Sequence, residues 1–126
     1  MNRQEAINYL KNLGLYFQDE KLLSFASLPS NQTKNVWWID IPCEKITNDC
    51  SKQLSLILYK PEEKVVYYLV IPMQFIHYNH DLFARRDKSG IDNFSFELSL
   101  DSFIDIRPNG SKLSFKSFIH GAFKTI

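Results

Sequence analysis

The chain has 126 residues, of which 44% are hydrophobic, so it is about one domain long and has enough apolar side chains to build one core. Fifteen Lys and Arg oppose fourteen Asp and Glu, spread evenly along the chain, which disfavours a general nucleic-acid binder. The longest nearly apolar run, residues 65–73, is far shorter than the roughly 20 residues that span a bilayer, and the N-terminal residues lack the apolar run of a secretory signal, so we expect a cytoplasmic protein with no membrane contact.

The N-terminal residues predict a helix over about residues 3–13. Asn2 and Glu5 have the spacing of a capping box, in which each side chain bonds the other residue's backbone N–H. The apolar residues that follow fall on one helical face (Ala6, Ile7, Leu10 and Leu13). Gly14 then supplies the left-handed residue that commonly ends a helix.

The next stretch is ambiguous. Residues 22–28 fit one or two helical turns or a short strand, and Pro29 ends the segment in both cases. The polar residues 30–35 then predict a loop.

Residues 36–42 read V-W-W-I-D-I-P and predict a short strand that ends at a proline. Side chains alternate across a strand, so Trp37, Ile39 and Ile41 share one face. Trp38 and Asp40 lie on the other face, which we expect to be half exposed. A polar loop or a single helical turn follows.

Residues 54–71 predict a β-hairpin, because two runs of branched and aromatic residues flank a charged turn that contains Pro61. The second run, residues 65–71, is apolar on both sides. We therefore expect it inside the sheet, covered by the N-terminal helix on at least one side. Pro72 then begins a short helix.

Residues 81–93 predict a charged connection that pivots at Gly90. Residues 94–100 read F-S-F-E-L-S-L, and this strict alternation predicts an antiparallel strand with one buried side. Residues 103–106 fit a further short strand before a turn that contains Asn-Gly. Ser114 then has the position of a cap for a short terminal helix.

Together these elements predict an α+β fold in a single domain over residues 1–126. We expect a mainly antiparallel sheet of about four or five strands, packed by the N-terminal helix and one or two short helices.

Four residues have side chains that could bind zinc: Cys43, Cys50, His77 and His80. The six-residue gap between the cysteines is not a structural zinc spacing, so we predict reduced thiols and no metal. The spacing of the four glycines matches neither the glycine-rich fingerprint of dinucleotide-binding proteins nor a phosphate-binding loop. No cysteine lies in a nucleophile motif. We therefore expect no cofactor, and we favour a protein that is not an enzyme.

The alternative is a small nucleic-acid-binding or metal-dependent nuclease-like protein. In that case Asp40 and Glu44 hold a divalent cation, with Lys45 close in sequence. The basic residues Arg85, Arg86 and Lys88 then contact the phosphate backbone. Solvated surface is the simpler interpretation of all these residues.

Eighteen of the 126 residues are aromatic, more than one small core of this length is expected to enclose. In each of the adjacent pairs Trp37-Trp38 and Tyr67-Tyr68, the two rings point to opposite sides of the strand, so each side carries one of them. Because interfaces favour Trp, Tyr and Arg, we predict a non-catalytic cytosolic binding protein that acts through an aromatic sheet face or edge. Its partner is a second copy, forming a homodimer, or another protein, and its candidate binding residues are Trp38, Tyr67, Tyr68, Arg85, Arg86 and Lys88.

Overall fold

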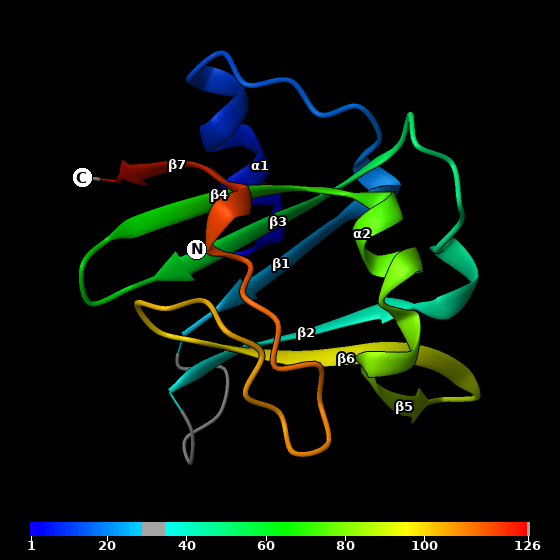
Figure 1. Cartoon of the computed structure of the whole chain (residues 1–126). Helices are drawn as coiled ribbons and strands as arrows, with labels where there is room; N and C mark the ends of the chain where they lie inside the picture. Colours follow the sequence, from blue (N-terminus) through cyan, green and yellow to red (C-terminus); the bar gives the residue numbers. More distant parts are fainter. Residues whose placement is uncertain (29–34, 126) are drawn as a thin grey trace.

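The computed structural model describes residues 1–28 and 35–125, and its first element is the predicted N-terminal helix, α1 (Arg3–Asn12; Figure 1). The capping box is confirmed: Asn2 Oδ1 accepts from the Glu5 N–H at 2.9 Å, and Glu5 Oε1 accepts from the Asn2 N–H at 3.0 Å. Gly14 has φ +91° after the last turn. The backbone N–H groups of Gly14 and Leu15 return to carbonyls of that turn, which is the Schellman arrangement that ends a helix.

A four-stranded sheet lies beneath this helix (Figure 1). Its spatial order is β1 (Leu23–Ser27), β3 (Gln53–Lys60), β4 (Val65–Pro72) and β7 (Ile119–Lys124). The predicted hairpin is confirmed as the β3–β4 pair, and β4 lies inside the sheet as expected. The ambiguous residues before Pro29 form β1, which pairs parallel to β3. Pro29 and most of the predicted polar loop lie outside the described residues.

A second sheet has three antiparallel strands, in the order β2 (Val36–Pro42), β6 (Ile91–Ser99) and β5 (Ala84–Lys88). The predicted strands at residues 36–42 and 94–100 are therefore confirmed as β2 and β6. The 81–93 connection is not a loop, because β5 and β6 form a hairpin across it. Its two-residue turn has positive φ at Ser89 (+55°) and Gly90 (+80°), the geometry that matches the twist of paired strands.

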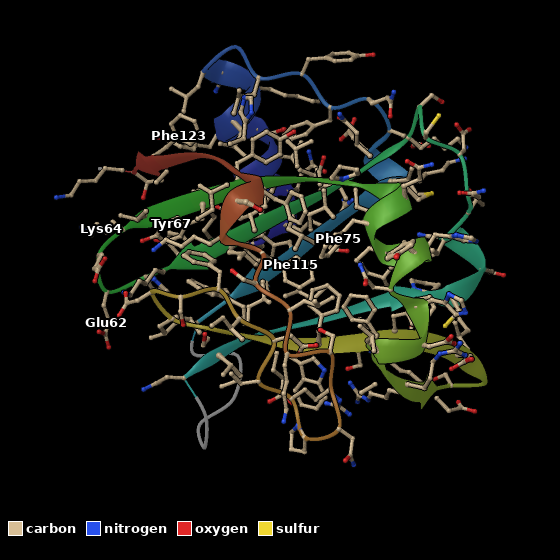
Figure 2. All side chains as sticks on the ribbon, in the orientation of Figure 1. Glu62, Lys64, Tyr67, Phe75, Phe115 and Phe123 are labelled. Carbon is tan, nitrogen blue, oxygen red and sulfur yellow. The ribbon has the colours of Figure 1, made fainter. Side chains whose placement is uncertain are left out.

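Alternation along the strands builds two cores. On β3, Ile57 faces α1, whereas Leu56 and Leu58 face the three-stranded sheet, and all three are fully buried. The core between the sheets also receives α2 (Met73–Tyr78), which follows Pro72 as predicted. Phe115 lies in this core with its ring centroid 5.6 Å from that of Phe75 on α2 (Figure 2). The remaining helical elements are single 3₁₀ turns at Glu20–Leu22, Cys43–Lys45, His80–Leu82 and Lys116–Phe118.

The C-terminal segment differs from the prediction. Instead of a terminal helix capped by Ser114, it forms one 3₁₀ turn and then β7, which pairs with β4 over Val65–Leu69. The open edge of β4 outweighs the weak local helical pattern, because pairing satisfies backbone groups along both strands. Residues 103–106 contribute two isolated bridges rather than a strand.

The α+β class, the single domain and the mainly antiparallel pairing are confirmed. Seven strands within the described residues form two sheets, however, where one sheet of four or five was expected. No helix in residues 1–28 and 35–125 is long and apolar enough to cross a membrane.

Candidate binding face around Trp38

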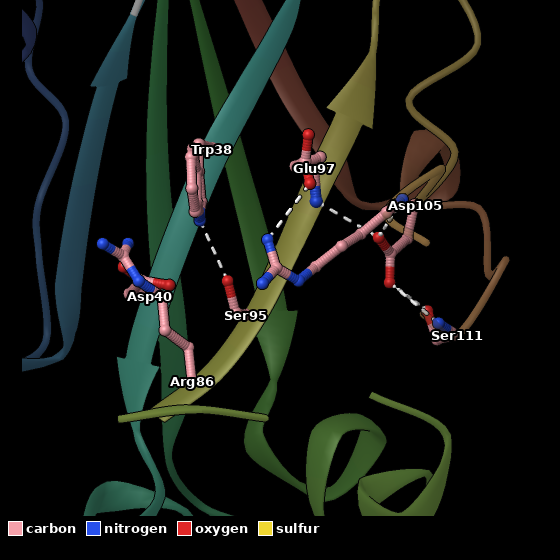
Figure 3. Close-up of polar contacts among 8 residues, drawn as sticks. Trp38, Asp40, Arg86, Ser95, Glu97, Asp105 and Ser111 are labelled. Atoms are coloured by element: carbon pink, nitrogen blue, oxygen red, sulfur yellow. Dashed lines mark hydrogen bonds and ion pairs between the residues drawn. The ribbon is translucent and has the colours of Figure 1, made fainter. Parts of the chain in front are cut away.

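The outward side of the three-stranded sheet carries a cluster of polar and aromatic side chains (Figure 3). Trp38 on β2 is the register partner of Glu97 on β6, and Asp40 is the partner of Ser95. Paired residues point to the same side of a sheet, so these four side chains gather there. Arg86 on β5 and Arg107, from the segment after β6, complete the group. We call these residues the Trp38 face (Trp38, Asp40, Arg86, Ser95, Glu97 and Arg107).

Trp38 is partly exposed and is held by three neighbours. Its Nε1–H donates to Ser95 Oγ at 2.9 Å (Figure 3). The guanidinium carbons of Arg86 and Arg107 lie 4.6 Å and 5.2 Å from the centroid of its ring, within the range of a cation–π contact. The indole is therefore fixed in one orientation on the sheet.

Each arginine also forms an ion pair. Arg86 Nη1 lies 2.8 Å from Asp40 Oδ2, and Arg107 Nη1 lies 3.1 Å from Glu97 Oε2. The arginine side chains are 37% and 20% exposed, whereas those of Asp40 and Glu97 are 17% and 5% exposed. The carboxylates thus lie deeper than the guanidinium groups that cover them. Asp40 Oδ1 is buried and has no hydrogen-bond partner among the described residues.

Asp105 is fully buried and ties the segment that carries Arg107 to the sheet. Its Oδ1 accepts from the backbone N–H groups of Glu97 (3.1 Å) and Arg107 (3.2 Å), and its Oδ2 accepts from the N–H (3.0 Å) and Oγ–H (2.7 Å) of Ser111 (Figure 3). Phe103, two residues earlier, has φ +54°, a rare conformation for a bulky residue. Tertiary contacts therefore determine the path of this segment.

Sequence reasoning did not single out Glu97, Arg107 or Asp105. The alternation of residues 94–100 predicted that Ser95 and Glu97 point outward, and they do. It also predicted that this side is exposed, which is wrong, because Ser95 is 0% and Glu97 is 3% exposed. Nothing local to the sequence indicated that residues 100–112 return over the strand.

The two predicted tyrosines lie elsewhere. Tyr68 is 4% exposed beneath α1, with its ring centroid 5.4 Å from that of Phe17. Tyr67 packs toward the core between the sheets, with ring centroids 5.8 Å from Trp37 and 5.2 Å from Phe103 (Figure 2). The structure therefore does not bring either tyrosine to Trp38.

The predicted basic residues separate along β5 because successive side chains point to opposite sides. Arg86 joins the Trp38 face, and Lys88, two residues further, lies exposed on the same side. Arg85 points the other way: its Nη1 lies 2.7 Å from Asp92 Oδ2, and its guanidinium carbon lies 4.6 Å from the centroid of the Phe94 ring. The Arg-Arg-Asp-Lys run is thus not one patch.

Three of the four possible zinc-binding side chains, Cys43, His77 and His80, line a second place. It is a hollow of about 190 Å³ whose lining also includes Ile46, Arg85 and Phe94. Burial raises the pKa of the Cys43 thiol, and Asp92 raises that pKa further against the opposing charge of Arg85. His80 is engaged at both ring nitrogens, by the His77 carbonyl at 2.8 Å and by Asp81 at 3.0 Å. A thiol with a raised pKa and an imidazole already engaged at both nitrogens make this hollow a poor nucleophilic site.

The predicted acidic pair does not have the geometry of a metal site. Asp40 is bonded to Arg86, whereas Glu44 borders a separate hollow beside Cys43, Gly90 and Asp92. Across residues 1–28 and 35–125, no three His, Cys, Asp or Glu side chains are placed to hold a metal ion. The nuclease alternative therefore gains no geometric support.

The fold and the Trp38 face define an α+β protein with two sheets and an arginine-covered tryptophan on one outer surface. Comparison with protein-family models, with characterised proteins and with solved structures finds no match to this chain. The chemistry of the face is therefore the basis for a functional assignment.

Proposed function

We propose that this chain is a non-catalytic cytoplasmic protein that binds a partner protein, either a second copy or a different chain, through the Trp38 face. The observation that carries the proposal is a partly exposed tryptophan on a sheet, with two arginine guanidinium groups over its ring. Trp and Arg are the residues most enriched among side chains that dominate the binding energy of protein interfaces.

The face is also ordered before any partner arrives. Ser95 holds the indole nitrogen, and Asp40 and Glu97 hold the two guanidinium groups. Binding then costs little further side-chain entropy, because these rotamers are already selected. A preorganised surface is a better binding site than the same residues on flexible loops.

Binding fits the face better than catalysis does. Both arginines are neutralised by carboxylates, and Ser95 is fully buried under Trp38. Nucleic-acid binding requires several cations that are not already paired, so two paired arginines contribute little to it. Protein recognition uses such paired charges for orientation and specificity.

The test compares Trp38→Ala with Tyr16→Ala, because Tyr16 is an 83% exposed aromatic residue remote from the face. Sedimentation at increasing protein concentration detects a homodimer, and affinity capture from cells that contain the protein detects a different partner. We expect Trp38→Ala to weaken the association at least about tenfold and Tyr16→Ala to leave it unchanged. Equal behaviour of the two variants, or no association of the wild type in either experiment, would overturn the proposal.

A further inference from the structure

We infer that the partner of the Trp38 face is an acidic segment of a different protein. Its carboxylates bind the outer N–H groups of Arg86 and Arg107, and an apolar side chain beside them packs against Trp38. This inference rests on the proposed function and adds the chemistry of the partner.

The depth of the charged groups determines what a partner meets first. The side chains of Arg86 and Arg107 are 37% and 20% exposed, whereas their carboxylate partners are 17% and 5% exposed. Lys88 is exposed on the same side of β5 as Arg86. A partner that approaches the face therefore meets cations and an indole, with the acids behind them.

The guanidinium groups retain the capacity to bind an external anion. A guanidinium carries five N–H donors in a planar fork, more than one carboxylate can accept. The contact of Arg86 with Asp40 and that of Arg107 with Glu97 each use Nη1. A partner carboxylate completes the coordination of these groups without breaking the existing ion pairs.

The same charges disfavour a second copy of this chain on the face. In a symmetric dimer the Trp38 faces meet each other, so Arg86 and Lys88 of one copy approach the same cations of the other. Like charges brought together at an interface oppose association. An acidic segment of another protein has the complementary charge.

A nucleic acid is also less well matched than a peptide. Phosphate-backbone binding draws its affinity from several unopposed cations along a groove, whereas Asp40 and Glu97 offset the charges of Arg86 and Arg107 and leave this face with little net positive charge. A peptide supplies carboxylates at isolated positions together with apolar side chains. An apolar side chain of such a peptide can pack on the exposed part of Trp38 while its carboxylates contact the arginines.

A phage-displayed random peptide library, panned on the immobilised full-length chain, tests the inference without a known partner. We expect enrichment of peptides rich in Asp and Glu that also contain an aromatic or aliphatic residue. Synthetic copies of the enriched peptides are then titrated against the wild type and four variants: Trp38→Ala, Arg86→Gln, Lys88→Glu and Arg85→Gln.

The variants have distinct expected results. Arg86→Gln and Lys88→Glu should each lower the affinity for the acidic peptides at least about fivefold. Raising NaCl from about 50 to about 500 mM should lower the affinity of the wild type by a similar factor. Arg85→Gln is the matched control, because Arg85 points to the opposite side of β5. The affinity of this variant for the acidic peptides should stay within about twofold of that of the wild type. The Lys88 side chain is exposed, so Lys88→Glu should fold and remains informative if Arg86→Gln does not fold.

The outcomes separate this inference from the proposed function. Enrichment of neutral peptides whose binding depends on Trp38 would overturn the inference of an acidic partner but would still support the Trp38 face as a binding site. Peptides whose binding is unaffected by Trp38→Ala, or a library with no enrichment, would overturn both. A fluorescein-labelled oligouridylate that binds more tightly than the best peptide, and loses affinity in Arg86→Gln, would replace the acidic segment with a nucleic acid.

Discussion

The guanidinium carbon of Arg86 lies 4.6 Å from the centroid of the Trp38 ring, although the two residues are on strands that are not neighbours in the sheet. β6 separates their strands, so long side chains bridge it from both sides. This contact links the edge strand β5 to β2 and covers Ser95 between them. It is the relationship on which the shape of the Trp38 face depends.

A double-mutant cycle with Trp38→Ala and Arg86→Ala measures that contact. We expect a coupling free energy of about 1 kcal/mol in urea unfolding, because the guanidinium is partly desolvated on the ring. Trp38→Ala with Arg85→Ala is the control, since Arg85 stacks on Phe94 on the other side of the strand. Additive effects of Trp38→Ala and Arg86→Ala would show that the stacking contributes nothing to stability.

Asp105→Ala should lower the free energy of unfolding by about 3 kcal/mol. The substitution removes the acceptor for three backbone N–H groups and one hydroxyl, and it leaves the N–H of Glu97 buried without this partner. Chemical denaturation provides the measurement. Asp101→Asn, at an exposed position with φ +66° that Asn tolerates, should change the stability by less than about 0.5 kcal/mol. Similar losses in the two variants would argue against the role of Asp105 in holding the segment.

Gly14→Ala should destabilise the protein by about 1 kcal/mol through the backbone alone. Gly14 has φ +91°, and a Cβ added there would meet no atom within 4 Å, so crowding makes no contribution. Thermal unfolding followed by circular dichroism measures the loss. Gly14→Asn should cost less than Gly14→Ala, because Asn accepts left-handed conformations more readily, and the reverse order would refute the backbone explanation.

Cys43 should react more slowly with iodoacetamide at pH 8 than Cys50, by about tenfold. Burial and Asp92 both raise the pKa of Cys43, so less of its thiol is ionised at this pH, whereas Cys50 is exposed. Timed alkylation followed by mass spectrometry of the two peptides gives the rates. Asp92→Asn should increase the alkylation rate of Cys43. An unchanged rate in that variant would contradict the role of Asp92 in raising the Cys43 pKa.

Local chemistry was sufficient for several elements. Asn2, Glu5 and Gly14 act on backbone groups within a few residues, so the start and end of α1 could be inferred from their spacing. The hairpin over residues 54–71 and the alternation in residues 94–100 likewise reflect interactions between near neighbours in sequence.

Edge strands were not predictable in the same way. β5 reads A-R-R-D-K and resembles a solvated loop, and it becomes a strand because its backbone pairs with β6. β7 resembles a weak helix, and it becomes a strand because β4 offers an open edge. In both cases a partner distant in space supplies the hydrogen bonds that the local sequence does not specify.

The sequence by itself determined the α+β class, the capped first helix, the central hairpin and the outward position of Trp38, because each follows from the periodicity and backbone preferences of a short segment. The tertiary structure alone decided that seven strands divide into two sheets, that Tyr67 and Tyr68 turn away from Trp38, and that Arg107 crosses to it. These features depend on contacts between residues far apart in the chain, and Asp105, buried at the base of the covering segment, is the residue whose hydrogen bonds make the last of them possible.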